Sequence, residues 1–174
     1  MKHILMTLAV PLIAVACASG PATAPPSGAT ALLQSTVGNS ANGSVSFTPS
    51  GSNVLVRGEI RGLKPNTEHG FHVHEKGDCS SGDGNSAGGH FNPDGKPHGN
   101  PAMMAHHVGD FPSLKSNAAG VAAFSFESST ISVGSGVGNV VGKGLIVHSD
   151  PDDYTTQPTG NSGTRLACAV IVRS

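Results

Sequence analysis

The sequence has little charge. Only 12% of its 174 residues are charged, and the formal net charge is −1 when the nine histidines are counted as neutral. A balance this close to zero argues against the strong basic field that nucleic-acid binding needs, so no nucleic-acid partner is expected and any electrostatic function must be local. The length suits one ordinary domain and is short for two.

The sequence also lacks an apolar run long enough for a membrane span. The apolar run near the N-terminus, Ile4–Ala16, is shorter than the roughly 20 residues that a helix needs to cross a bilayer. It follows Lys2 and precedes small residues, which is the pattern of a signal peptide. We therefore expect an exported protein of the periplasm or cell envelope.

Two cleavage sites compete at the end of this run. Residues 14–17, AVAC, resemble the lipobox of bacterial lipoproteins, although that motif usually begins with leucine. A cut before Cys17 would make residues 1–16 the signal peptide and leave a lipid-modified cysteine that tethers the protein to the membrane. A cut at the A-x-A site that overlaps this cysteine would remove residues 1–18. The Pro- and Ala-rich composition of residues 17–30 is typical of a tether and favours the lipoprotein.

Cysteine is scarce, with three residues in the chain. None belongs to a C-x-x-C pair, so a zinc site made of thiolates is not expected. Either cleavage leaves Cys79 and Cys168 as an even pair in the mature domain. In an exported protein such a pair favours a disulfide over two buried free thiols.

Short alternating runs fill the chain from residue 31 onward. Val, Ile, Phe and Thr recur with period two at intervals near ten residues, which predicts an all-β sandwich or barrel of about eight antiparallel strands. Two segments break this rhythm, Gly77–Pro112 and Ser149–Thr164, and loops of that length are usually functional. The predicted strands lie within residues 31–37, 44–49, 53–63, 69–77, 121–128, 140–150 and 165–173.

Two histidines stand one residue apart in the stretch GFHVHEKGDC, residues 70–79. On a strand His72 and His74 share one face, while Phe71 and Val73 take the other face and can fill the core. One strand histidine is usually a packing or surface residue. Two side by side would repel each other when charged, whereas a shared cation makes the pair stabilising. The pair therefore favours a metal site.

The long loops and a late strand supply further ligands for such a site. They reach the paired histidines only if the first loop folds back over the strand. Imidazole suits zinc, copper, iron and nickel, and a closed set of histidines with one carboxylate suits zinc. The additional candidate ligands are His90, His98, His107, Asp110 and His148.

Five segments carry a resemblance to a known family. In order along the chain they are GFHVHEKGDC, SAGGHFNP, HHVGDFP, LIVHSDPDD and TGNSGTRLACAVI. They are similar, in order and spacing, to the conserved segments of copper/zinc superoxide dismutase, and the similarity extends from about residue 31 to the C-terminus. The resemblance implies a Greek-key sandwich or barrel in residues 31–174, with the two long loops carrying the function.

The resemblance also implies which residues hold the metals, with one copper and one zinc ion per subunit. His90 would bridge the two ions through its two ring nitrogens. The implied copper ligands are His72, His74, His90 and His148, and the implied zinc ligands are His90, His98, His107 and Asp110.

Further roles follow from the same resemblance. Asp152 would link a copper histidine to a zinc histidine, namely His72 to His98, and Cys79 and Cys168 would form the disulfide. Arg165 would lie beside copper and attract the substrate anion. The implied reaction converts two superoxide anions and two protons to dioxygen and hydrogen peroxide. Copper would cycle between Cu(II) and Cu(I), His90 would carry a proton, and zinc would be structural.

The sequence departs from the family in the second long loop, which is short and has no charged residue between Asp153 and Arg165. Long-range guidance of the anion is therefore expected to be weaker, or to come from Lys96, Lys115 and Lys143.

Several other residues receive structural roles. His69 is out of phase with the strand pair and is expected to be structural, and the H-V-G-D spacing favours His107 over His106 as the ligand. Met103 and Met104 are expected to cap the loop or to pack under it.

Two other classes of protein could use these ligands. One is a copper or zinc carrier without turnover, and the other is a non-catalytic sandwich domain with a structural zinc loop. Arg165 and Asp152 argue against the carrier, because a store needs no anion-binding group. The sequence does not decide whether the protein forms a homodimer.

Overall fold

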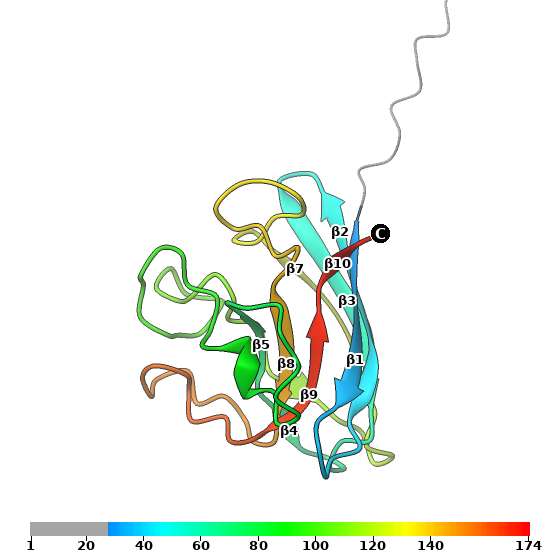
Figure 1. Ribbon diagram of the computed structural model, residues 1–174. Coiled ribbons are helices and arrows are strands. Elements are labelled where there is room, and N and C mark those ends of the chain that lie inside the picture. The colour runs from blue at the N-terminus through cyan, green and yellow to red at the C-terminus, as the bar shows by residue number, and fades with distance from the viewer. Residues whose placement is uncertain (1–27) are drawn as a thin grey trace, which may run out of the picture.

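The computed structural model describes residues 28–174 and contains ten β-strands and one short 3₁₀ helix within them (Figure 1). The predicted signal peptide, Cys17 and nearly all of the predicted tether lie outside the described residues. Among the described residues, no helix is long and apolar enough to span a membrane. The strands are β1 (Ala29–Ser35), β2 (Asn42–Ser50), β3 (Asn53–Arg61), β4 (Glu68–His69), β5 (Phe71–His74), β6 (Leu114–Lys115), β7 (Ala122–Ser128), β8 (Gly144–His148), β9 (Arg165–Val170) and β10 (Val172–Arg173), and the helix is η1 (Asn85–Ala87).

The strands confirm the all-β prediction. Seven of them form the antiparallel order β5-β8-β9-β1-β2-β3-β7, and β10 adds to β1 to complete an eight-stranded curled sheet. The connections from β3 to β5 and from β7 to β8 cross between opposite ends of this order, which is connectivity of the Greek-key type. β1 begins at Ala29, two residues before the predicted start of the domain.

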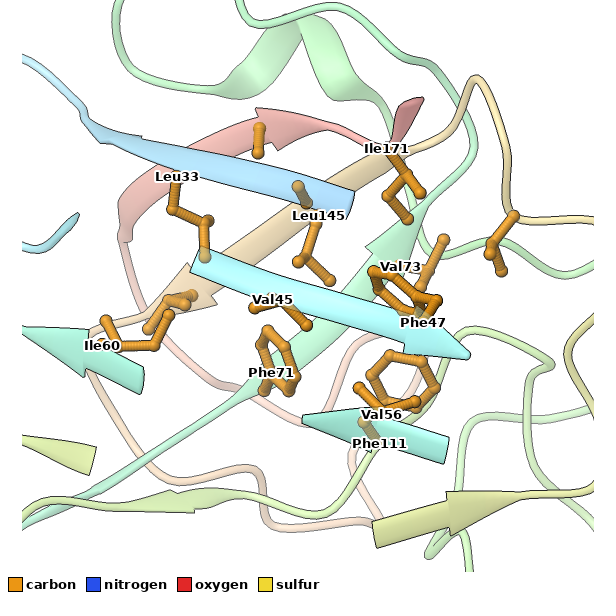
Figure 2. Packing of buried hydrophobic residues seen from close by; sticks show 14 of the residues in the cluster. Leu33, Val45, Phe47, Val56, Ile60, Phe71, Val73, Phe111, Leu145 and Ile171 are labelled. Carbon is orange, nitrogen blue, oxygen red and sulfur yellow. The ribbon is translucent and has the colours of Figure 1, made fainter. Parts of the chain in front are cut away.

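The concave side of the sheet is filled by one apolar core (Figure 2). Alternation along the strands produces it, because in β1 the side chains of Ala29, Ala31 and Leu33 are buried while those between them are exposed. Phe71 lies at its centre, with its ring centroid 5.5 Å from that of Phe111 and 5.2 Å from that of Phe124. These contacts tie β5 to the end of the first long loop and to β7.

Two strands depart from simple alternation because both of their faces are covered. All four residues of β5 and all five of β8 are buried. One face of each strand packs on the core. The other face is covered by the two long loops, which lie next to β5 and β8 at that end of the sheet (Figure 1). The histidines of β5 are therefore enclosed by loops.

The structure differs from the sequence analysis in two smaller features. Met103 and Met104 are 66% and 94% exposed, so they do not pack under the loop. The two-residue strands β4 and β6 pair with each other outside the main sheet, and the alternation pattern missed β6 because two residues carry no periodicity.

Candidate metal centre

The first long loop folds back along the free edge of β5. Val73 donates its N–H to the carbonyl of Gly109 at 2.9 Å, and its carbonyl accepts the N–H of Phe91 at 2.8 Å. Two further bridges place His72 opposite Asp110 and His74 opposite His90. Because residues opposite each other in an antiparallel pair share a face, the loop side chains lie beside the β5 histidines.

Four histidines gather at this face, and we call them the β5 group. Their candidate ligand nitrogens all lie within 4.8 Å of one another, and all four residues are buried. The ring of His72 is 4.0 Å from that of His90 and 5.0 Å from that of His148, measured between centroids. The β8–β9 pairing shifts its register between Val147 and His148, so the irregularity lies at the His148 ring. The β5 group is His72, His74, His90 and His148.

A second set, the loop group, meets the first at His90. Its ligand atoms also lie within 4.8 Å of one another. His90 Nδ1 lies 2.8 Å from Asp110 Oδ1 and 3.3 Å from His107 Nδ1, and His98 Nδ1 lies 3.1 Å from Asp110 Oδ2. The Asp110 carboxylate is held in place by the backbone, because its Oδ2 accepts the N–H of Gly99. The loop group is His90, His98, His107 and Asp110.

The ring nitrogens test whether metal ions fit these groups. One nitrogen of each ring in the β5 group is buried and has no hydrogen-bond partner: Nδ1 of His72 and Nε2 of His74, His90 and His148. Nδ1 of His98 in the loop group is also buried without a well-aligned hydrogen bond, and its one polar neighbour is Asp110 Oδ2 at 3.1 Å. Buried polar atoms without partners cost roughly 1–3 kcal/mol each, so a cluster of five at one place needs a common partner. Lone pairs of neutral imidazoles converging with a carboxylate fit copper and zinc.

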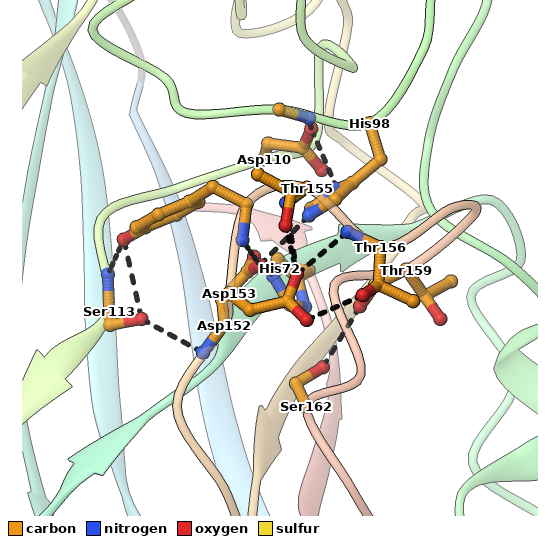
Figure 3. Close-up of polar contacts among 12 residues, drawn as sticks. His72, His98, Asp110, Ser113, Asp152, Asp153, Thr155, Thr156, Thr159 and Ser162 are labelled. Atoms are coloured by element: carbon orange, nitrogen blue, oxygen red, sulfur yellow. Dashed lines mark hydrogen bonds and ion pairs between the residues drawn. The ribbon is translucent and has the colours of Figure 1, made fainter.

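Asp152 fixes the rings of both groups (Figure 3). Its Oδ2 lies 2.6 Å from His72 Nε2 and its Oδ1 lies 2.8 Å from His98 Nε2. When each ring is neutral and donates from Nε2 to this carboxylate, its Nδ1 lone pair is directed into its own group. The backbone carbonyl of Gly88 does the same for His74, accepting from Nδ1 at 2.9 Å. Such partners select the tautomer that a metal needs.

The pKa values of the rings depend on burial and on the carboxylates of Asp110 and Asp152. Burial lowers the pKa of His90 to about 4, although Asp110 opposes the shift, and burial also lowers the pKa of His74 and His148 well below its ordinary value. For His98, burial lowers the pKa, but its bonds to Asp110 and Asp152 together outweigh burial and raise it to about 9. The β5 group is therefore held neutral, in the form that binds a metal.

Two residues that support the centre were assigned no role from the sequence. Gln157 clamps His98 to the second long loop, because its side chain accepts the N–H of His98 and donates to its carbonyl, both at 2.9 Å. Gly160 has a φ of +67°, and a Cβ at this position would overlap the Asp152 carboxylate. Only glycine fits both the backbone conformation and the space.

Arg165 lies at the mouth of a cavity of about 680 Å³ that the rings of His74, His90 and His148 also line. Its guanidinium donates to two carbonyls of the first loop, those of Gly84 and Gly88, each at 2.7 Å. Arg165 and three rings of the β5 group therefore line the same cavity. These two hydrogen bonds fix the orientation of the guanidinium at the cavity.

The remaining predicted features fall as follows. Cys79 and Cys168 form the predicted disulfide, with a Cα–Cα distance of 5.8 Å, and so join the first loop to β9. His69 is fully buried outside both groups, where its Nδ1 donates to the carbonyl of His148 at 2.8 Å. His107 belongs to the loop group, whereas His106 does not and instead donates from Nδ1 to the carbonyl of His107.

Comparison with known proteins defines the class. The family model of copper/zinc superoxide dismutase matches residues 41–171. The solved structure of the clock protein EA4 superposes with a TM-score of 0.78 at 38% sequence identity, covering 86% of this chain and 96% of that one. The chain belongs to the copper/zinc superoxide dismutase family, whose members are oxidoreductases that act on superoxide and use copper and zinc.

Several relatives share this domain. The superoxide dismutase [Cu-Zn] of Paramecium bursaria Chlorella virus 1 is 43% identical over 135 residues, covering 74% of this chain and 71% of the relative. The superoxide dismutase [Cu-Zn] 2 of Aquifex aeolicus is 38% identical over 133 residues, covering 74% and 78%. The extracellular superoxide dismutase [Cu-Zn] of Drosophila melanogaster is 40% identical over 137 residues, covering 74% of each chain.

Proposed function

We propose that the β5 group holds copper, that the loop group holds zinc, and that this centre dismutes superoxide outside the cytoplasm. The observation that carries the assignment is the position of His90, which belongs to both groups and directs a different ring nitrogen to each. Four imidazoles suit copper in both of its oxidation states. Three imidazoles with one carboxylate make a closed set that suits zinc.

When bound, copper supplies one-electron chemistry and zinc supplies a fixed positive charge with no redox chemistry. The chain supplies the rest. Arg165 attracts a small anion into the site cavity and orients it beside the rings of His74 and His148, because its guanidinium is immobilised by two carbonyls. His90 Nε2 is a neutral nitrogen facing the cavity, so it can hold a proton and pass it to the product.

The second long loop keeps this geometry in place. Asp152 holds the rings of His72 and His98, and Gln157 holds the backbone of His98, so the loop contacts ligands of both groups. Every ring in the two groups is buried, and three of them line the site cavity. We infer that the loop's role is to orient ligands.

Metal analysis combined with a xanthine oxidase/cytochrome c assay on the purified mature protein tests the proposal. We expect one copper and one zinc ion per chain, and loss of cytochrome-reducing superoxide in proportion to copper content. The alternative is a metal carrier that uses the same ligands without turnover. Full occupancy of both sites without activity would favour the carrier and contradict the proposal.

We propose further that the protein is exported and works in the periplasm or cell envelope. The disulfide supports export because such bonds persist in oxidising compartments, and relatives from Drosophila melanogaster and Brugia pahangi are named extracellular. The proposed boundaries are a signal peptide of residues 1–16, a tether from Cys17 to residue 30 and the enzyme domain thereafter. Mass spectrometry of the mature N-terminus distinguishes a lipid on Cys17 from cleavage after residue 18.

We propose a homodimer as the assembly in solution. Val170 and Val172 at the C-terminal strands support it, because they are large apolar side chains that are 36% and 53% exposed. Sedimentation equilibrium of the metal-loaded protein tests this, and a monomer at micromolar concentrations would contradict it.

A further inference from the structure

The site cavity has an unusual balance of charge at its mouth. Besides His74 of β5, His148 of β8 and Arg165 of β9, its lining comes from three segments, namely the turn after β1, the first long loop and the second long loop. Apart from the imidazoles, only Arg165 and Asp83 among the described lining residues carry an ionisable group. The others are mainly hydroxyl, amide and glycine residues. One positive charge therefore stands against one negative charge where the substrate anion enters.

Asp83 is held rigidly in this position. Its carboxylate accepts the backbone N–H of Asn85 at 2.9 Å and the side-chain amide of the same residue at 2.7 Å. The carbonyl of Gly84, in the middle of this turn, is also one of the two that bind the Arg165 guanidinium. One turn thus fixes the arginine and carries the opposing carboxylate.

The two charges act on each other and on the rings. Burial lowers the pKa of Arg165 and the Asp83 carboxylate opposes that shift, so the field of Asp83 reaches the guanidinium. The guanidinium in turn contributes to the lowered pKa of His74 and His148. Bonds to Asn85 and Ser81 lower the pKa of Asp83 itself, which keeps it ionised at neutral pH.

The three lysines that the sequence suggested as a source of long-range attraction for the anion do not lie at the cavity. Lys115 pairs with Glu68 at 2.9 Å, and Lys96 lies 3.6 Å from Asp94. Lys143 donates to the carbonyl of Glu75 and stacks over the ring of Phe91. None of the three lines the cavity. Among the described residues that line the cavity, Arg165 is therefore the one side chain with a permanent positive charge near Asp83.

We propose that Asp83 is a specificity-determining residue of this enzyme, a fixed counter-charge that cancels part of the Arg165 field and so reduces the capture of anions. The proposal rests on the proposed function, because it requires the catalytic metal to lie behind this mouth. Its consequence is an enzyme whose rate depends little on ionic strength and whose site is poorly occupied by competing anions such as phosphate. The substrate class is still a small anion, but it reaches the site with little long-range attraction.

Asp83→Asn tests the proposal, because it removes the charge and keeps an oxygen to accept the Asn85 N–H. The matched control is Asp78→Asn in the same loop. Asp78 also caps a turn, because its side chain accepts the N–H of Ser80 at 2.8 Å, but Asp78 does not line the cavity. Both variants change the net charge of the chain by the same amount, so they differ only in where the charge is lost.

We expect kcat/KM of Asp83→Asn, measured by stopped flow on copper- and zinc-loaded protein, to exceed that of the native enzyme roughly threefold at about 10 mM ionic strength. The gain should disappear near about 300 mM, where charges are screened over a few ångströms. The Asp78→Asn control should stay within about 1.5-fold of the native rate throughout, since an exposed charge outside the mouth adds little.

Azide binding, followed by its absorption band on copper, gives a second readout that needs no turnover. Azide should bind roughly threefold tighter to Asp83→Asn than to the native protein or the control. Equal rates or equal azide affinities for the two variants, or a gain that persists at high salt, would overturn the proposal. A metal-loaded native enzyme that fails to dismute superoxide would instead overturn the proposed function, while the azide comparison would still report on the mouth.

Discussion

His90 is the residue on which the two groups of ligands depend. Its Nδ1 faces Asp110 and His107, and its Nε2 faces the three other rings of the β5 group without a partner. A neutral imidazole can offer a lone pair on only one nitrogen, so serving both groups requires an imidazolate or a proton held on one side. The ring is therefore both a ligand and a place to store a proton.

Substitution of His90 tests the shared ring directly. In native protein with cobalt in the zinc position, we expect magnetic coupling between copper and cobalt. In His90→Ala this coupling should be lost, because no other side chain belongs to both groups. Electron paramagnetic resonance of the copper signal measures it. His106→Ala is the control and should retain coupling; coupling that survives in His90→Ala would show that the ring does not bridge.

Arg165 is predicted to act on the substrate rather than on the metals. Charge reversal in Arg165→Glu should lower kcat/KM on the order of 10- to 100-fold, because it replaces attraction of the anion by repulsion. Metal content by mass spectrometry should stay the same, since the guanidinium contacts carbonyls and no ligand side chain.

Arg61→Glu is the matched control for this reversal. Arg61 lies on β3, is exposed and pairs with Glu59, so its reversal changes the net charge equally but away from the cavity. A comparable rate loss in both variants would assign the effect to overall charge.

At the scale of elements, the sequence predicted the strands well and the loop contacts poorly. β1 and β3 follow from alternation, because each buries every second side chain over much of its length, whereas β6 is too short to show a period. The family resemblance named every member of the two groups, and all of them except His98 lie in the five quoted segments. The partners of Arg165 and Val73 are main-chain atoms, which leave no trace in residue identity. Gln157 is likewise an ordinary loop residue until the fold brings it to His98.

The first long loop is attached to the sheet covalently as well as by hydrogen bonds. The Cys79–Cys168 disulfide closes a loop of 89 residues between the start of this segment and β9. Replacing both cysteines by serine should lower the free energy of unfolding by roughly 4 kcal/mol in the chain-entropy model. Urea denaturation of the metal-free protein measures this loss. Ser80→Ala, next to the disulfide, should change the midpoint little, and an equal loss in this control would contradict the prediction.

At the scale of the whole molecule, the metal-free protein should be most stable near pH 6.5. His90 has a pKa lowered to about 4, so between pH 6.5 and 4 the unfolded chain binds a proton that the folded chain does not. Stability therefore falls as the pH falls through this window, by on the order of 3 kcal/mol for this ring. His74 and His148 add to the loss in the same direction.

Above pH 6.5, His98 makes the stability of the metal-free protein depend on pH in the opposite direction. Its pKa is raised to about 9, so its contribution is present below pH 6.5 and is lost as the pH rises to 9. Denaturant midpoints of the metal-free, disulfide-intact protein across this range measure both limbs. His98→Gln should remove the alkaline fall and leave the acid fall. A native protein whose stability increases as the pH is lowered from 6.5 to 4 would contradict the prediction.

The single carboxylate of Asp152 has a consequence for how the protein loses its ions. Since one side chain orients a ring in each group, the second long loop cannot swing away from one ion while it still supports the other. A chelator that acts through such an opening would strip copper and zinc together, with a shared rate set by the loop, instead of emptying the weaker position first.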